Sequence, residues 1–246
     1  MFCGCETKST QGKRVYMLFV TANELEINDD RIIDRFSLGG GTFSNPSTVF
    51  VNGIPIEHID GGGTFLTISN CLYAGDNQVY VSNVEENGLF VYVVEAQSDW
   101  PEGVSRALGF SKTGKITFQI EEDWKGPIFE PLNAEQRSAE KVQNVISDLV
   151  DLINQRNGEL FFEKLAMSYR TTITREGSQK SFEEIKNNLV SIVENFKGQC
   201  KTNEYQVIYG DNGIFISGQP IEAGELLIND FSLVQINGKL EIWRPY

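Results

Sequence analysis

Short hydrophobic runs, rich in β-branched and aromatic residues, dominate the first half of the chain. From Arg14 to about Gln119 they are separated by Gly, Asn and Asp, at intervals typical of an antiparallel sandwich. The runs are VYMLFVTANELEI, STVFVNGIPIEHI, TFLTISNCLYAG, NQVYVSNV, LFVYVVEAQ and KITFQIEE. We expect an all-β sandwich domain over residues 14–120. Turns are expected at Asn52-Gly53 and Gly75–Asn77, because Gly and Asn tolerate positive φ.

The motif GGGTF occurs twice in this half, at 39–43 and 61–65, and raises the question of a phosphate-binding loop. Such a loop must lead into a helix N-terminus, where free N–H groups meet the anion. The second motif leads into the strand-like LTISNCLY, and Pro46 closely follows the first. Both motifs are therefore predicted to be turns or bulges of the β domain.

Helical periodicity appears only in the second half. Apolar residues at helical spacing predict a helix within Ala134–Gln155, which Asn157-Gly158 ends. These residues are Val142, Val145, Ile146, Leu149, Leu152 and Ile153. After a short apolar segment, LFFEKLA, the run SYRTTITRE at 168–176 predicts a strand.

A capping box, formed by Ser181 and Glu184, predicts the start of a second long helix that Gly198 ends. Its expected buried stripe is Phe182, Ile185, Leu189, Ile192 and Phe196. A meander of strands is expected to follow, with a hairpin turn at Asn237-Gly238. The predicted strands are Tyr205–Tyr209, Gly213–Ser217, Glu225–Ile236 and Lys239–Arg244.

These patterns divide the chain into four parts. Residues 1–13 form a polar tether, 14–120 the sandwich, 121–133 a linker and 134–246 an α+β domain. The linker, EEDWKGPIFEP and its flanks, carries Trp124, Ile128 and Phe129, which are too apolar for a free tether. We therefore expect these three side chains to pack between two separately folding domains.

Composition and charge exclude several classes of function. The formal net charge of −13 repels nucleic-acid phosphates and anionic lipids, and no stretch collects Lys and Arg on one face. No apolar run reaches the roughly 18 residues of a membrane span. We expect no nucleic-acid partner, and contact with a membrane only through a lipid anchor.

No metal site or cofactor is expected. Of the four cysteines only Cys3 and Cys5 are close in sequence, and the single histidine, His58, is far from them. A Cys-x-Cys pair alone cannot provide the four ligands of a structural zinc site. Cys71 is predicted to be a small buried hydrophobic residue, and no bridge from it to Cys200 is expected.

The N-terminal residues MFCGCETKSTQGKR resemble the end of a bacterial lipoprotein signal, in which a small residue precedes the cysteine that becomes lipidated. The resemblance makes Cys5 the candidate for lipidation and ETKSTQGK its polar tether. Phe2 stands where Leu is usual, and no charged and apolar signal regions precede it. Two interpretations stay open: Met1 is internal to a longer reading frame that carries a signal, or the N-terminus is the polar tail of a cytoplasmic protein.

The segment VFVNGIPIEHIDGGGTFLTISNCLYAGDNQVYVSNV resembles galactose-binding-like jelly-roll modules, in its strand and NG turn, its Gly-rich loop and its G-x-N-x-V-x-V strand. The resemblance implies a jelly-roll-like sandwich. A carbohydrate site in such a module would need exposed aromatic residues beside polar groups. Tyr73, Tyr92 and Trp100 are the candidates, although a core or inter-domain position is the favoured interpretation for them.

The segment order after Ala134, together with INDFSLVQINGKLEIWRPY, resembles the NTF2-like (SnoaL-like) superfamily and its final hairpin. The resemblance implies an α+β cone with a concave pocket. That superfamily includes isomerases, dehydratases and cyclases that act on small apolar molecules, and members that only bind or dimerise. The fold alone therefore does not decide the function.

Four residues are predicted to line such a pocket, because they combine apolar bodies with polar groups. They are Tyr169, Tyr205, Asp230 and Trp243. The alternation of strand residues sets a condition: Trp243 lines the pocket only if Leu240 and Ile242 face the other way.

Catalysis is not the favoured interpretation. Residues 134–246 contain no histidine, and a Ser-His-Asp arrangement could use only His58, which is expected to be a structural residue. Calcium binding by Asp29, Asp30 and Asp34 is disfavoured, because the spacing is wrong and two arginines lie beside them.

The sequence thus favours a non-catalytic binding or interaction protein of a bacterial cell envelope, whose partner is an unknown protein or a small apolar ligand. A homodimer through the C-terminal sheet is a further expectation. Two alternatives remain: an enzyme of the isomerase, dehydratase or cyclase type that uses the pocket, and a carbohydrate-binding accessory protein.

Overall fold

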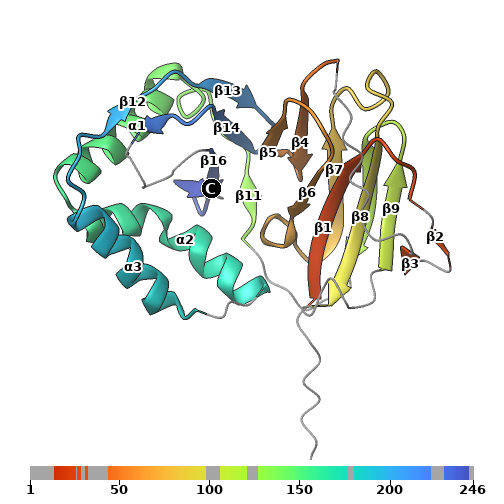
Figure 1. The fold of residues 1–246 in the computed structure, drawn as a ribbon, viewed down its shortest axis with the longest axis horizontal. Coiled ribbons are helices and arrows are strands. Elements are labelled where there is room, and N and C mark those ends of the chain that lie inside the picture. Colours follow the sequence, from red (N-terminus) through yellow and green to blue (C-terminus); the bar gives the residue numbers. More distant parts are fainter. Residues whose placement is uncertain are drawn as a thin grey trace, which may run out of the picture.

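The computed structural model describes residues 14–25, 27–28, 31–32, 44–97, 106–120, 127–176, 180–222 and 230–243. These residues form a sandwich-like N-terminal region of two antiparallel sheets, followed by three helices and a C-terminal antiparallel sheet (Figure 1). The expectation of a β region followed by an α+β region is confirmed.

The first sandwich sheet has the strand order β2-β3-β9-β8-β1-β6. Its strands are β1 (Arg14–Thr21), β2 (Ile27–Asn28), β3 (Arg31–Ile32), β6 (Thr64–Thr67), β8 (Phe90–Gln97) and β9 (Arg106–Ser111). The sequence analysis missed β9, whose residues RALGFS contain no β-branched side chain. Pairing with β8 makes this segment a strand where its own composition does not.

The second sandwich sheet has the order β10-β7-β4-β5. Its strands are β4 (Ser47–Val51), β5 (Ile54–Ile59), β7 (Gly75–Val81) and β10 (Lys115–Ile120). Asn52 and Gly53 connect β4 to β5 with φ angles of 51° and 78°, so the predicted turn is confirmed. The second GGGTF motif leads into β6, as expected, and the first lies outside the described residues.

The two sheets enclose one apolar core. Alternate residues of β1, namely Tyr16, Leu18 and Val20, point into it, and Val79 and Val81 of β7 approach from the other sheet. A 3-10 turn, Ser69–Cys71, carries the fully buried Cys71 into the same core. Within the described residues of 14–120 this turn is the only helical element.

Helix α1 (Ala139–Asn154) begins at Ser138, whose side chain accepts a hydrogen bond from the Lys141 N–H. Its buried residues are Val142, Ile146, Leu149, Val150 and Ile153, close to the predicted stripe. Helix α3 (Phe182–Glu194) begins with the predicted capping box of Ser181 and Glu184. The stripe predicted for α3 is shifted, because Val190 and Val193 are buried whereas Ile192 is 39% exposed.

Helix α2 (Gly158–Glu176) overturns one expectation: the segment 168–176, predicted as a strand, is its C-terminal half. Two threonines in it satisfy their hydroxyl groups within the helix, since Thr171 donates to the Met167 carbonyl at 3.0 Å and Thr174 to the Arg170 carbonyl at 2.7 Å. The helix packs against α3, β17 and the 3-10 turn. These tertiary contacts outweigh the strand preference of the β-branched residues.

The C-terminal sheet has the order β11-β16-β14-β13, and β17 pairs with β16. Its strands are β11 (Phe129–Glu130), β13 (Gln206–Tyr209), β14 (Gly213–Ser217), β16 (Phe231–Ile236) and β17 (Lys239–Trp243), beside a separate pair of β12 (Lys201–Thr202) and β15 (Ile221–Glu222). Asn237 and Gly238, with φ of 51° and 74°, form the predicted hairpin turn. Strand β11 comes from the expected linker, of which residues 121–126, with Trp124, lie outside the described part.

This sheet is the middle layer of the molecule, between the sandwich and the helices (Figure 1). Val234, Ile236 and Trp243 join the sandwich core, whereas Leu233 and Ile242 belong to the core beneath the helices. Strand β16 is therefore buried on both faces.

Hydrogen bonds join the sandwich to the C-terminal sheet. The Ser232 hydroxyl donates to the Pro55 carbonyl at 2.6 Å, and the Asn212 side chain donates to the Asn52 carbonyl at 2.8 Å. At the same place Gly53 suits the junction, because its φ of 78° disfavours other residues and a Cβ there would lie only 3.1 Å from the Asn212 side chain. Phe129 is buried against Trp243, with ring centroids 5.2 Å apart, while Ile128 is 76% exposed.

Candidate functional site

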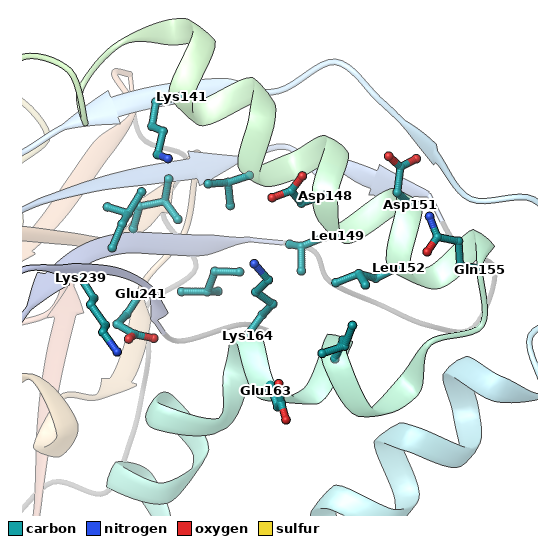
Figure 2. Close-up of a pocket in the computed structure, with 15 residues that line it drawn as sticks. Lys141, Asp148, Leu149, Asp151, Leu152, Gln155, Glu163, Lys164, Lys239 and Glu241 are labelled. Carbon is teal, nitrogen blue, oxygen red and sulfur yellow. The ribbon is translucent and has the colours of Figure 1, made fainter.

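A groove of about 850 Å³ lies between α1, α2 and the β16–β17 hairpin (Figure 2). Helices α1 and α2 lie over the outer face of the C-terminal sheet, and α2 packs against β17, but some apolar side chains between these elements stay partly exposed. The groove has an apolar floor and a charged rim.

The floor combines residues from both helices and both hairpin strands. On α1, Val145, Leu149 and Leu152 follow helical spacing and face the sheet. The other apolar lining residues are Leu160, Leu233, Leu240 and Ile242. Leu149, Leu233 and Ile242 are buried, but Leu160 is 46% exposed, so apolar surface remains uncovered at the mouth.

Charged side chains of both signs surround this floor: Lys141, Asp148, Asp151, Glu163, Lys164, Lys239 and Glu241. Figure 2 shows that they do not all point the same way. Lys141 and Asp148 from α1 and Lys164 from α2 point into the space between the helices, whereas Asp151 and Glu163 point away from it. Lys239 and Glu241 lie together at the sheet end of the groove.

Glu241 is a partly buried acid at the sheet end of the groove. Partial burial raises the pKa of its carboxyl group above the usual value, and the nearby ammonium groups of Lys239 and Lys164 oppose that shift. The carboxylate therefore carries a desolvation cost that a proton would remove.

The predicted pocket residues lie elsewhere, Trp243 most clearly. It is fully buried on the side of the sheet that faces the sandwich, edge-on to Phe129. Leu240 and Ile242, its neighbours on β17, line the groove. Leu240 and Ile242 face the groove and Trp243 faces away from it, so the condition under which Trp243 would line the groove is not met.

The other three residues are also absent from the groove lining. Tyr169 stacks on Phe162 within α2, and burial raises the pKa of its hydroxyl group. The Tyr205 hydroxyl donates to Gln143 at 2.7 Å, and Asp230 accepts the Gly218 N–H at 3.0 Å. None of the four residues lines the groove, and their role as a ligand-binding set stays a prediction.

His58 has partners on both ring nitrogens: Thr48 Oγ1 lies 3.1 Å from Nδ1, and Asp60 Oδ1 lies 3.2 Å from Nε2. The order Thr-His-Asp resembles a nucleophile triad, but the burial is the reverse of a working one. The Thr48 hydroxyl group is on a buried residue, whereas the Asp60 side chain is 80% exposed. A nucleophile must be reachable and its orienting carboxylate shielded, so the geometry fits a cross-strand structural contact.

The sandwich aromatics named as carbohydrate candidates have structural contacts. Tyr92 is fully buried and its hydroxyl oxygen accepts the Leu25 N–H at 2.7 Å, while the Tyr73 backbone bonds to the Asn77 side chain. Trp100 lies outside the described residues, as do Cys5 and the Asp29, Asp30 and Asp34 cluster.

Neither described thiol is accessible. Cys71 and Cys200 are both buried and neither is in a disulfide within the described residues, and burial raises the pKa of Cys200 to about 11. In the described part of the chain, no group of three or more His, Cys, Asp or Glu side chains is placed to hold a metal ion. Nor is any helix among the described residues long and apolar enough to cross a bilayer.

The sequence analysis missed the groove for two reasons. It assigned the C-terminal half of α2 to a strand, so α2 was not recognised as a wall that places Lys164 opposite α1. It also favoured residues with both apolar and polar parts, although the floor is aliphatic. The available signal was Glu241, a carboxylate flanked by Leu240 and Ile242 on a predicted strand.

Comparisons with protein-family models, with curated proteins and with solved structures find no match to this chain.

Proposed function

We propose that this protein is a non-catalytic binding protein that holds a small molecule with an apolar body in the groove between α1, α2 and β17. The observation that carries the proposal is the incompletely covered aliphatic floor, Leu152, Leu160 and Leu240, inside a volume of about 850 Å³. Pockets of this size and composition are typical of ligand sites, and the exposed apolar surface would be buried by a ligand.

The chemistry of the lining supports binding over catalysis. The residues around the groove are aliphatic or singly charged side chains, with Gln155 as the neutral polar group. General acid–base catalysis needs a proton donor and acceptor at hydrogen-bond distance from a reacting group, usually with a partner that orients them. Burial raises the pKa of the Glu241 carboxyl group, but this residue stands at the sheet end rather than over the floor (Figure 2).

In this proposal the C-terminal region is an NTF2-like (SnoaL-like) α+β cone and the N-terminal region a jelly-roll-like accessory module. The order of three helices and a sheet that ends in a hairpin supports the first assignment. A homodimer through the C-terminal sheet would have to use strand edges such as β13 or β17, because the sandwich covers one face and the helices cover much of the other.

The proposed compartment is the bacterial cell envelope, with Cys5 as the lipidated residue of a longer precursor. Gly4-Cys5 and the polar residues after it support this part of the proposal. Expression of the extended reading frame should give protein that pellets with membranes, and Cys5→Ser should release it. Soluble protein from the extended frame with Cys5 intact would contradict the assignment.

The groove is tested with N-phenyl-1-naphthylamine, an uncharged fluorescent probe of apolar sites. We expect saturable binding to the full chain with one site per molecule. Leu160→Asn should weaken it about fivefold, as expected when one partly exposed leucine contact is replaced by a polar group. The matched control is Ile192→Asn, at a similarly exposed apolar residue of α3 that does not line the groove. Absence of saturation, or equal losses in both variants, would overturn the proposal.

A further inference from the structure

The charged groups of the groove give information about its ligand, provided that the groove is a binding site as proposed above. We propose that the groove selects molecules with a single negative head group, which Lys164 binds between the two helices while the apolar body lies along Leu149, Leu152 and Ile242. The ligand class is therefore an anionic amphiphile, such as a carboxylate or sulfonate with a hydrocarbon or aromatic body.

The charges that point into the groove do not cancel. Between the helices Lys141 and Lys164 face one opposing acid, Asp148, and at the sheet end Lys239 and Glu241 balance each other (Figure 2). The inward-facing groups thus carry one excess positive charge. The remaining lining acids, Asp151 and Glu163, point away from the space that a ligand would occupy.

The ammonium groups of the lysines that line the groove are available to a ligand. Lys141, Lys164 and Lys239 form no ion pair within 4.0 Å with any residue in the described ranges. Some lysines outside the groove are already paired: Lys186 with Glu159 at 2.7 Å and Lys201 with Glu222 at 3.0 Å. A head group beside Lys164 would gain a charge-assisted hydrogen bond without breaking one that already exists.

The position of Lys164 over aliphatic surface links the charge to the apolar floor. Its side chain lines the same groove as Leu149 and points into the space between the helices (Figure 2), where the hydrocarbon part of a ligand would displace water. An ion pair whose surroundings lose water is stronger than one at an open surface. A neutral ligand would leave this ammonium group partly desolvated without a partner, so the groove discriminates against it.

The net charge of −13 does not prevent an anion from binding here. At physiological ionic strength charges are screened over about 8 Å, so the groups within the groove dominate the potential at the head group. Distant acids lower the association rate more than the affinity.

Glu241 makes this selectivity depend on pH. The charged groups around it in the groove are Lys239 on its own strand, Lys164 from α2, and Lys141 and Asp148 from α1, while Glu163 of α2 points away and β16 contributes the apolar Leu233. Protonation of Glu241 removes a negative charge from the groove lining and leaves the positive charges of Lys239 and Lys164 less compensated. Anion binding should therefore become tighter as the pH falls from neutrality towards the raised pKa of this carboxyl group.

The test compares two probes that differ by one charge: 1-anilinonaphthalene-8-sulfonate, whose sulfonate stays ionised, and the uncharged N-phenyl-1-naphthylamine. In the full chain, Lys164→Gln should weaken binding of the sulfonate probe about fivefold, and it should not weaken binding of the neutral probe. Lys197→Gln, at an exposed lysine outside the groove, is the matched control and should change neither.

A second variant tests the role of the carboxylate. Glu241→Gln should tighten sulfonate binding about threefold at pH 7.5 and remove most of its pH dependence, whereas Glu163→Gln should have little effect. Failure of the neutral probe to bind would overturn the proposed function itself. Normal binding of the neutral probe, with a sulfonate affinity that ignores Lys164→Gln, would overturn only the charge selectivity.

Discussion

The two faces of the C-terminal sheet differ in how completely they are covered, although the same two strands supply both. On the sandwich face, Trp243 and Val234 are fully buried in a shared core, and Ser232 is tied to Pro55. On the helix face, Leu233 and Ile242 are also buried, but neighbouring Leu240 and Leu160 are left partly exposed in the groove. The closed face stabilises the fold, and the open face is free to bind.

This difference shows how one strand serves two purposes. Side chains alternate along β17, so Trp243 and Ile242 are committed to opposite faces by the backbone alone. Substitutions on the closed face should therefore change stability and leave probe binding intact. Substitutions on the open face should change probe binding and leave stability nearly intact.

The largest effect is expected from removal of the sandwich. The fragment Ala134–Tyr246 lacks β11 and exposes Val234, Ile236 and Trp243, which the intact chain buries against the sandwich. We expect this fragment to lose cooperative unfolding, although the sequence pattern alone predicts an independent domain. Urea denaturation followed by far-UV circular dichroism measures it. A sigmoidal transition at an unchanged midpoint would show that the closed face is dispensable.

The next effect concerns one side chain of the closed face. Trp243→Ala should lower the free energy of unfolding by about 3–5 kcal/mol, because it leaves a cavity beside Phe129. Affinity for N-phenyl-1-naphthylamine should not change in the folded protein. Tyr209→Ala, at an aromatic residue of β13 that is 45% exposed, is the control and should cost less than about 0.5 kcal/mol. A loss of probe binding with Trp243→Ala would mean that the two faces are coupled.

The sequence predicts local features of the fold, but not which face of the C-terminal sheet is covered. Turn chemistry and capping are local, so Asn52-Gly53, Asn237-Gly238 and the capping box of Ser181 were all predicted correctly. Alternation showed that Trp243 and Ile242 face opposite ways. It could not show which face is open, because that depends on where the helices and the sandwich pack.

The errors have tertiary causes. The segment 168–176 is helical because it belongs to α2, which packs against α3 and β17, and β9 is a strand because β8 provides a partner. Predicting the groove would have required the positions of both α2 and the β16–β17 hairpin. Residues such as Lys164 could therefore not be assigned to a site from local pattern alone.

The two cores can also be compared through their thiols, since Cys71 lies in the sandwich core and Cys200 in the core beneath the helices. In a variant with Cys3 and Cys5 replaced by serine, we expect both to react slowly with a thiol reagent at pH 8. Cys200 should react faster of the two, because it adjoins the short β12–β15 pair near the protein surface. Its pKa of about 11 keeps the folded thiol protonated, so labelling must follow local opening. Faster labelling of Cys71 would contradict the view that the sandwich face is the better closed one.

The smallest expected effect is the stability cost of the partly buried Glu241 carboxylate at the sheet end of the groove. Because burial raises its pKa, the folded chain takes up a proton at a higher pH than the unfolded chain does. Its contribution to stability is therefore greatest below the ordinary pKa of a glutamate and is lost as the pH rises through the raised pKa. At pH 7.5 the ionised, partly desolvated carboxylate destabilises the fold, so Glu241→Gln should raise the free energy of unfolding there. Solvent screening keeps the gain below about 1 kcal/mol, because the side chain is only partly buried.

Urea titrations of the wild type, Glu241→Gln and the outward-pointing Glu163→Gln between pH 5 and pH 8 measure the difference. The gain from Glu241→Gln should shrink as the pH falls. A gain that is constant with pH, or that Glu163→Gln reproduces, would mean that it comes from packing or net charge rather than from the desolvated carboxylate.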